Sequence, residues 1–216
     1  LRLSAVETAV LVIAVLGLTG GAIQGSKSRR APAGLETDGR RRRSQDSRAR
    51  IVQAMLELVH AGDPSPGAEQ VAERAQVGLR TVFRHFKDMD SLYREMSAVI
   101  EKEYMAVVDR PFEGRTWRER VLELVRRRAG VYEKIEPYKR ASNVHRHRSP
   151  FLQADHARRV ATARDILRRE LPADVARDRA LFEALDLLLS FEAWMRLRRD
   201  QDLSPRRASE VLEQAI

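Results

Sequence analysis

The chain has 216 residues, 43% of them hydrophobic, which is enough to bury a substantial core in one large or two small domains. Lys and Arg number 40 against 31 Asp and Glu, and this net charge of +9 favours a polyanionic partner, nucleic acid before a membrane surface. The sequence contains no cysteine, which excludes disulfides, thiol catalysis and cysteine-based zinc fingers. Aromatic residues are few and strand-like alternation is nearly absent, so the sequence predicts an all-α fold.

Residues 8–23 form an uncharged, apolar run that differs from the rest of the chain. A membrane-spanning helix needs roughly 20 apolar residues, with a lower limit near 17, so the run is short for an anchor. A secretory signal needs a basic start and a small-residue cleavage site, and both are poorly provided here. For residues 1–24 we favour an appendage outside the folded domain, or a segment translated from an upstream start, over an anchor or a signal peptide.

Residues 25–47 are rich in Gly, Ser, Pro and Arg and lack a hydrophobic period, which predicts a disordered basic linker. Together with the apolar run this linker makes up a first segment, residues 1–46. The Arg residues at positions 40–43 have two interpretations. They reach phosphates or the minor groove of DNA as an N-terminal arm, or they form a solvated charge run ahead of the first helix.

The first predicted helix spans residues 47–60, with an apolar stripe made by Ile51, Met55, Leu58 and Val59. Arg48 lies in its first turn, where the helix dipole disfavours a cation, and this is tolerable if Arg48 faces phosphates. A Gly- and Pro-rich loop at residues 61–67 then leads to the next helix.

Residues 68–86 carry the strongest motif in the chain. Residues 68–75 have the period of a short amphipathic helix, residues 76–78 interrupt that period, and Leu79 restarts it. Two short helices joined by a tight turn, with Val77 buried between them, make a helix-turn-helix. The second helix and its end carry donors suited to phosphates and base edges: Arg80, Thr81, Arg84, His85 and Lys87.

The rest of the chain predicts further helices at residues 90–108, 117–135, 150–171, 173–199 and 204–216. Pro137 is predicted to end the second of these, before a short basic segment. Apolar residues cover nearly the whole circumference of residues 181–197. A helix near a chain terminus is rarely buried on all sides by its own domain, so the pattern predicts a subunit interface.

The head of the chain resembles the N-terminal domain of tetracycline-repressor-like (TetR family) transcriptional regulators. The resemblance rests on VAERAQVGLRTVFRHFKDMDSL at residues 71–92, which follows the family pattern I-A-x-x-A-G-V-S-x-x-T-x-Y/F-x-Y/H-F. Three residues depart from it: Gln76 replaces a turn glycine, Gly78 a helix-capping serine, and Met89 a phosphate-binding lysine. The missing cap is worth about 0.5–2 kcal/mol, or less if Gly suits the position, and none of the departures removes the motif.

The resemblance implies a three-helix DNA-binding head at residues 47–93 and a helical effector-binding and dimerisation body at residues 94–216. It implies that Thr81 and His85 hold phosphates, that Phe83 lies at the edge of that contact, and that Arg80 and Arg84 read bases or backbone. Aromatic residues of the body are candidates for a ligand pocket or for plain core: Trp117, Tyr132, Phe151, Phe182 and Trp194, with Phe191 beside them.

We therefore expect a cytoplasmic homodimer that binds a palindromic operator in double-stranded DNA and is released by a small-molecule effector, without a cofactor or a membrane partner. No Ser/His/Asp set, carboxylate pair or phosphate loop indicates an enzyme. His145 and His147 alternate with arginines and do not share a helix face, so no metal site is expected. The alternatives are a ligand-independent DNA-binding dimer and a helical scaffold or enzyme with a basic RNA- or membrane-binding surface.

Overall fold

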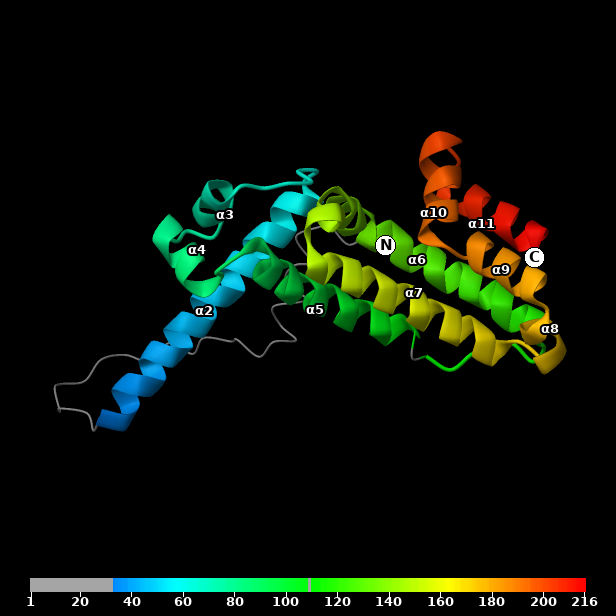
Figure 1. Ribbon diagram of the computed structural model, residues 1–216, viewed down its shortest axis with the longest axis horizontal. Coiled ribbons are helices and arrows are strands. Elements are labelled where there is room, and N and C mark those ends of the chain that lie inside the picture. Colours follow the sequence, from blue (N-terminus) through cyan, green and yellow to red (C-terminus); the bar gives the residue numbers. More distant parts are fainter. Residues whose placement is uncertain (1–32, 109) are drawn as a thin grey trace. The chain divides into compact units, whose positions relative to one another are not determined.

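The computed structural model describes residues 33–108 and 110–216, and in that part of the chain every regular element is helical (Figure 1). The chain divides into two units, Leu1–Arg41 and Arg42–Ile216, and the architecture below is that of the second, together with the start of its first helix, which lies in the first unit. Its α-helices are α2 (Ala33–His60), α3 (Ala68–Arg74), α4 (Leu79–His85), α5 (Met89–Val108), α6 (Trp117–His145), α7 (Pro150–Glu170), α8 (Ala173–Arg177), α9 (Arg179–Leu188), α10 (Phe191–Met195) and α11 (Pro205–Ala215). A 3-10 turn (Arg146–Arg148) precedes α7 and a π-helical turn (Arg196–Asp200) follows α10.

Helix α2 corrects the predicted disordered linker, because it begins at Ala33 rather than at residue 47. Arginine is a good helix former, so a run of arginines is compatible with a helix although it has no apolar period. The apolar run at residues 8–23 lies outside the described residues. No helix among residues 33–108 and 110–216 is long and apolar enough to cross a membrane.

The first hydrophobic core, the head core, is built by α2 to α5. The predicted stripe of α2 supplies Ile51, Met55 and Val59, each at most 2% exposed. Val71 from α3 and Val82 from α4 pack against them, so the two short helices predicted at this point are present and share one core with α2.

Helix α6 corrects a second prediction, since it continues through Pro137 to His145 instead of ending there. A proline inside a helix removes one backbone hydrogen bond and costs about 3 kcal/mol. The turn beyond it is held by the head core, which Ala141 joins and against which Tyr138 packs. The His60 and Tyr138 rings lie 6.2 Å apart. Tertiary packing thus overrides a local helix breaker.

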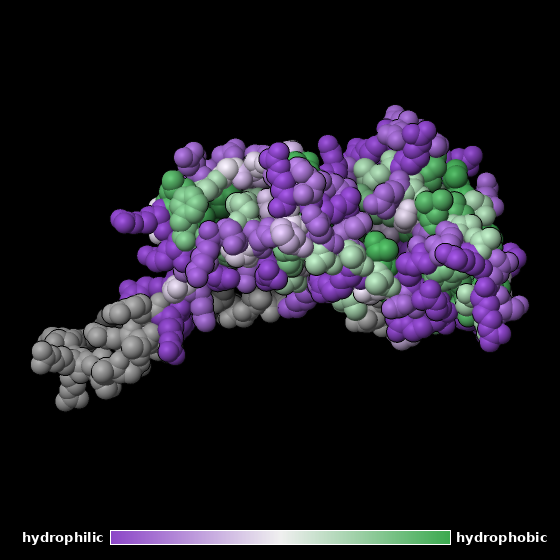
Figure 2. All heavy atoms as spheres, viewed as in Figure 1, coloured by the Kyte–Doolittle hydropathy of each residue, from purple (hydrophilic) through white to green (hydrophobic). Residues whose placement is uncertain are grey.

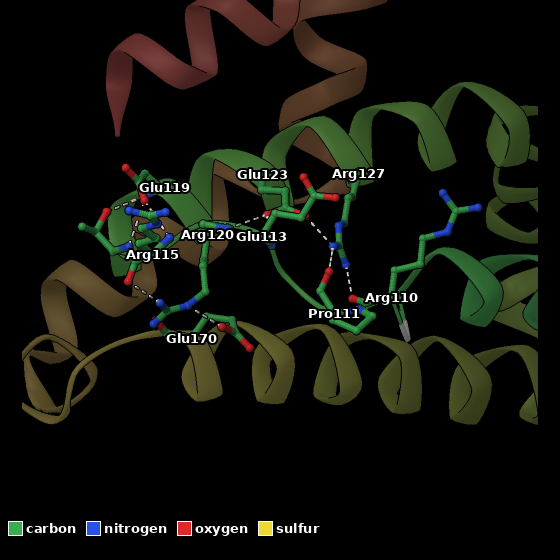
Figure 3. A network of polar contacts seen from close by, with 11 residues as sticks. Arg110, Pro111, Glu113, Arg115, Glu119, Arg120, Glu123, Arg127 and Glu170 are labelled. Atoms are coloured by element: carbon green, nitrogen blue, oxygen red, sulfur yellow. Dashed lines mark hydrogen bonds and ion pairs between the residues drawn. The ribbon is translucent and has the colours of Figure 1, made fainter.

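The loop between α5 and α6 is fixed to α6 by charged side chains (Figure 3). Glu123 accepts the backbone N–H of Gly114 at 3.3 Å, and Arg127 donates to the carbonyl of Pro111. Arg120 pairs with Glu170 at the end of α7 at 2.8 Å. These contacts anchor the first turns of α6 to both the preceding loop and the neighbouring helix.

The predicted long helix over residues 173–199 is wrong, because the chain is broken there into α8, α9, α10 and the π-helical turn. The breaks before α9 and before α10 each carry a side chain that caps the next helix. Asp178 accepts from the backbone N–H of Leu181, and Ser190 accepts from that of Ala193, both at 3.0 Å. The breaks let this apolar segment wrap around the body instead of exposing one side of a straight helix.

The second hydrophobic core, the body core, joins α6 and α7 to the C-terminal helices. Val121 and Leu167 are fully buried in it, and Trp194 is 1% exposed. Not all of the apolar segment is covered, because Leu181 is 40% and Leu187 is 66% exposed on α9. Figure 2 shows hydrophobic surface over these C-terminal helices.

Candidate functional site

Helix α4 presents a basic and partly aromatic surface. Arg80, Phe83 and Arg84 are exposed on it, and exposed Lys87 follows directly after its end. The Phe83 side chain is 57% exposed, and Figure 2 shows hydrophobic surface in the region of α3 and α4. Thr81 is half-buried. The structure therefore brings most of the predicted DNA-contacting residues together on one short helix.

His85 differs from the exposed residues of that group because its ring is partly buried. The side chain is half-buried, and its Nε2 is buried without a hydrogen-bond partner among the described residues. Burial, followed by the positive charges of Arg84 and Arg48, lowers the pKa of His85 below its usual value. The ring is therefore held neutral at physiological pH.

Arg48 has a structural role within the fold that the sequence did not reveal. Its Nη1 donates to the carbonyl of His85 at 2.9 Å, and its Nη2 pairs with Glu95 of α5 at 2.9 Å. The guanidinium also lies over the Phe86 ring, 4.6 Å from its centroid. Arg48 thus ties α2 to the end of α4 and the start of α5, while its predicted contact with phosphate stays a prediction.

The turn between α3 and α4 contains a strained residue. Gln76 has a φ of 53°, in the left-handed region that favours glycine. Gly78, at the N-cap of α4, provides no side-chain cap. Both positions are departures from the family pattern, and the turn keeps its conformation through backbone bonds such as Val77 N–H to the carbonyl of Ala72 at 3.0 Å.

We expect Gln76→Gly to stabilise the protein. A left-handed conformation costs a non-glycine residue about 1–2 kcal/mol, and the greater freedom of glycine in the unfolded chain offsets part of this gain, which leaves roughly 1 kcal/mol. The measurement is urea unfolding. Gln201→Gly is the matched control, because Gln201 has an ordinary φ of −103° and should lose stability. Equal effects of the two substitutions would contradict the assignment of strain to Gln76.

Helix α5 connects the α4 region to the body. Its first turn contains Asp90, which accepts the Ser149 hydroxyl at 2.6 Å, and Ser149 in turn caps α7. Further along α5, the Ser97 hydroxyl lies 3.5 Å from Asp155 of α7. In Figure 1, α5 runs beside α6 and α7, and all three helices contact one another. Helix α5 follows α4 in the chain and therefore connects it with α6 and α7 through direct contacts with these two helices.

The body contains a cavity of about 130 Å³ between α5, α6, α7 and the α9–α10 region. Tyr132 and Phe191 meet edge to face in its wall, with ring centroids 5.4 Å apart. The other lining residues mix apolar and charged side chains: Glu101, Tyr104, Met105, Arg128, Ile135, Lys139, His156, Arg158, Arg159, Val160, Thr162, Ala163, Asp186, Ser190 and Glu192.

Of the five predicted pocket aromatics, only Tyr132 lines this cavity. Phe182 and Trp194 are buried in the body core, and Trp117 packs against it. Phe151 lies under the Arg94 guanidinium, 4.5 Å from it. The structure places these four in packing positions, the alternative left open for them, because apolar helices supply core and cavity from one periodic pattern. The sequence reasoning missed Arg128 and Lys139, which looked like surface charges.

The polar groups in the cavity wall are partly desolvated. The Tyr132 hydroxyl donates to the carbonyl of Leu189 at 2.8 Å, and burial raises the pKa of Tyr132 above its usual value. Lys139 Nζ lies 3.5 Å from His156 Nδ1. Burial and then the charge of Lys139 lower the pKa of His156. Among the described residues no group of three His, Cys, Asp or Glu side chains is placed to hold a metal ion.

We expect the free energy of unfolding to fall as the pH is lowered below about 6.5. His85 and His156 both have pKa values below the usual 6.5 in the folded chain, so the unfolded chain binds protons first as the pH falls. Their contribution is complete above the unfolded pKa and is lost as the pH passes down through the folded values. Urea unfolding at pH 7.5 and 5.5 measures this. Between pH 7.5 and 5.5 the double variant His85→Asn/His156→Asn should lose less free energy of unfolding than the parent. An equal loss would disprove that these two histidines cause the pH dependence.

No protein-family model matches the sequence, and no curated protein matches it. Among solved structures, the chain is similar to the crystal structure of the multidrug binding protein EbrR complexed with imidazole. The TM-score is 0.51 at 21% sequence identity, and the match covers 78% of this chain and 94% of the EbrR chain. This similarity, together with the helices described above, confirms the predicted all-α fold.

Proposed function

We propose that this protein is a DNA-binding transcriptional regulator. It is a cytoplasmic homodimeric repressor, and a small-molecule effector releases it from its operator. Residues 47–93 serve as the DNA-binding domain and residues 94–216 as the effector-binding and dimerisation domain. The observation that supports this most is the exposed set Arg80 and Arg84 on α4, with Lys87 just after its end, where α4 follows another short helix and a tight turn. The resemblance of residues 71–92 to the TetR family supports the same function.

The proposed mechanism uses α5 as the link between effector and DNA. The start of α5 follows α4 directly and is hydrogen-bonded through Asp90 to Ser149, while Tyr104 and Met105 near its end line the body cavity. A ligand in the cavity favours one position of α5, and the two α4 helices of a dimer then lose the spacing of successive major grooves. The similarity to a multidrug binding protein is consistent with a ligand-binding body.

The test of this function is a gel shift of the full chain with the DNA around its own gene, at two salt concentrations. Sequence-selective binding that survives the higher salt supports the regulator. Binding that is unselective and lost in salt would reflect only counterion release by a basic surface, and the specific-repressor proposal would then be abandoned.

The proposed dimer buries the exposed apolar residues of α9. We expect Leu187→Glu to shift the chain toward monomer by at least tenfold in the dissociation constant, because a carboxylate is costly to bury in an apolar interface. Sedimentation or light scattering measures the shift. Val144→Glu is the matched control, because Val144 is 48% exposed on α6, and it should leave the oligomeric state unchanged. Equal dissociation constants of the two variants would show that α9 does not form the dimer interface.

A further inference from the structure

The cavity wall contains a buried arginine with no acidic partner. Arg128 is 4% exposed, and its Nη1 and Nη2 donate to the carbonyls of Leu189 at 3.0 Å and Ala163 at 2.7 Å. Its Nε has no hydrogen-bond partner, and no carboxylate among the side chains that the structure describes forms an ion pair with it. Arginines this deeply buried are normally paired with an anion, because carbonyl dipoles offset only part of a full charge.

A second cation lies in the same wall. Lys139 Nζ is 3.5 Å from the His156 ring and 5.5 Å from the centroid of Phe191, and it forms no ion pair within the described part of the chain. Burial lowers the pKa of Lys139, and the attraction of Glu192 offsets part of this effect. Two cations therefore border one cavity, and neither has a carboxylate of its own.

Most other charges in the wall are already neutralised. Arg158 pairs with Glu101 at 2.9 Å, and Arg159 pairs with Asp155 at 2.8 Å. Asp186 is held by Arg164, which lies outside the lining, at 2.6 Å. The remaining acid in the lining, Glu192, is exposed, so solvent screens its field more than that of the buried arginine. The buried part of the wall is left with an excess of positive charge.

The rest of the cavity lining suits the apolar part of a ligand. Tyr104, Met105, Ile135 and Val160 line the cavity together with the edge-to-face pair of Tyr132 and Phe191. The cavity volume of about 130 Å³ is of the order that holds one aromatic ring, since an apolar protein cavity of about 150 Å³ binds benzene.

We propose that the effector of this protein is a small organic anion, a single-ring molecule whose carboxylate lies against Lys139, while Arg128 adds positive charge to the same cavity wall. The inference rests on the proposed function in that it names the chemical class of ligand for the same body cavity. The carboxylate supplies the close ion pair that Lys139 lacks among the described side chains, and the ring occupies the apolar wall.

The test is isothermal titration calorimetry of the full chain, without DNA, against three probes of similar size and different charge: benzoate, benzamide and benzylammonium. We expect benzoate to bind about tenfold or more tightly than benzamide, because charge-assisted hydrogen bonds replace neutral ones, and benzylammonium to bind most weakly. Equal or tighter binding of either other probe, or no benzoate binding at millimolar concentration, would overturn the proposal.

Two variants test the sign of the charge without touching the buried arginine. Glu192→Gln should tighten benzoate binding severalfold, because it removes the opposing charge at the wall, whereas a cation site would be weakened by it. Lys139→Gln should weaken benzoate binding about tenfold. Lys134→Gln is the matched control on the exposed side of α6 and should change nothing. Weaker benzoate binding by the Glu192→Gln variant would contradict an anion site. Equal effects of Lys134→Gln and Lys139→Gln on benzoate affinity would contradict it as well.

Binding to the cavity and control of DNA are separate readouts. Benzoate binding with the expected charge dependence, in a chain that shows no selective DNA binding, would keep the anion site and end the regulator proposal. Selective DNA binding in a chain whose cavity prefers benzamide or benzylammonium would keep the regulator and end the anion proposal.

Discussion

Arg84→Ala is expected to weaken binding to the selected operator by about 1–3 kcal/mol, or roughly fivefold to 150-fold, and to relax discrimination at one base pair. Arg84 is exposed in the last turn of α4, and its guanidinium makes no hydrogen bond or ion pair with the described residues. Nothing inside the protein therefore competes with DNA for this side chain, and its removal should leave the fold intact. Gel shifts with the operator and with a mutated operator measure both effects.

The control for Arg84→Ala is a variant with the same change in net charge at a distant place. Arg206 lies in the first turn of α11, and its side chain is 89% exposed. Arg206→Ala should reduce nonspecific attraction slightly and leave operator selectivity unchanged. If the two variants weaken binding equally, α4 does not read the operator and the binding is generic electrostatics.

Trp194→Ala is expected to lower the free energy of unfolding by about 3–5 kcal/mol, the range for removing a large aromatic from a packed core. The Trp194 side chain is 1% exposed, and its Nε1 donates to Glu133 at 2.9 Å. Arg198 also pairs with Glu133, at 2.8 Å, so the carboxylate keeps a partner and the loss arises mainly from packing. Urea or thermal unfolding measures the change.

Trp117→Ala provides the comparison, because Trp117 is only half-buried at the start of α6 and should cost clearly less. The folded fraction of Trp194→Ala should bind cavity ligands with unchanged affinity. A small stability loss combined with a large loss of ligand affinity would instead return Trp194 to the ligand pocket, as the sequence had suggested.

The head was predictable because its signals are local. The apolar stripe of Ile51, Met55 and Val59, the interrupted period around Val77 and the donors on the following helix all lie within a few turns of one another. The sequence did not reveal that Arg48 is tied to Glu95 and to the carbonyl of His85, since those partners are brought near it only by folding.

The sequence by itself determined an all-α chain, an exposed basic surface at Arg80 and Arg84, and an apolar C-terminal segment. Only the tertiary structure decided that α6 passes through Pro137, that four of the aromatic candidates lie outside the lining of the body cavity, and that Arg128 and Lys139 border it. The physical reason is that helix period and charge are properties of neighbouring residues. Burial of a charge without an acidic partner depends on helices far apart in the chain.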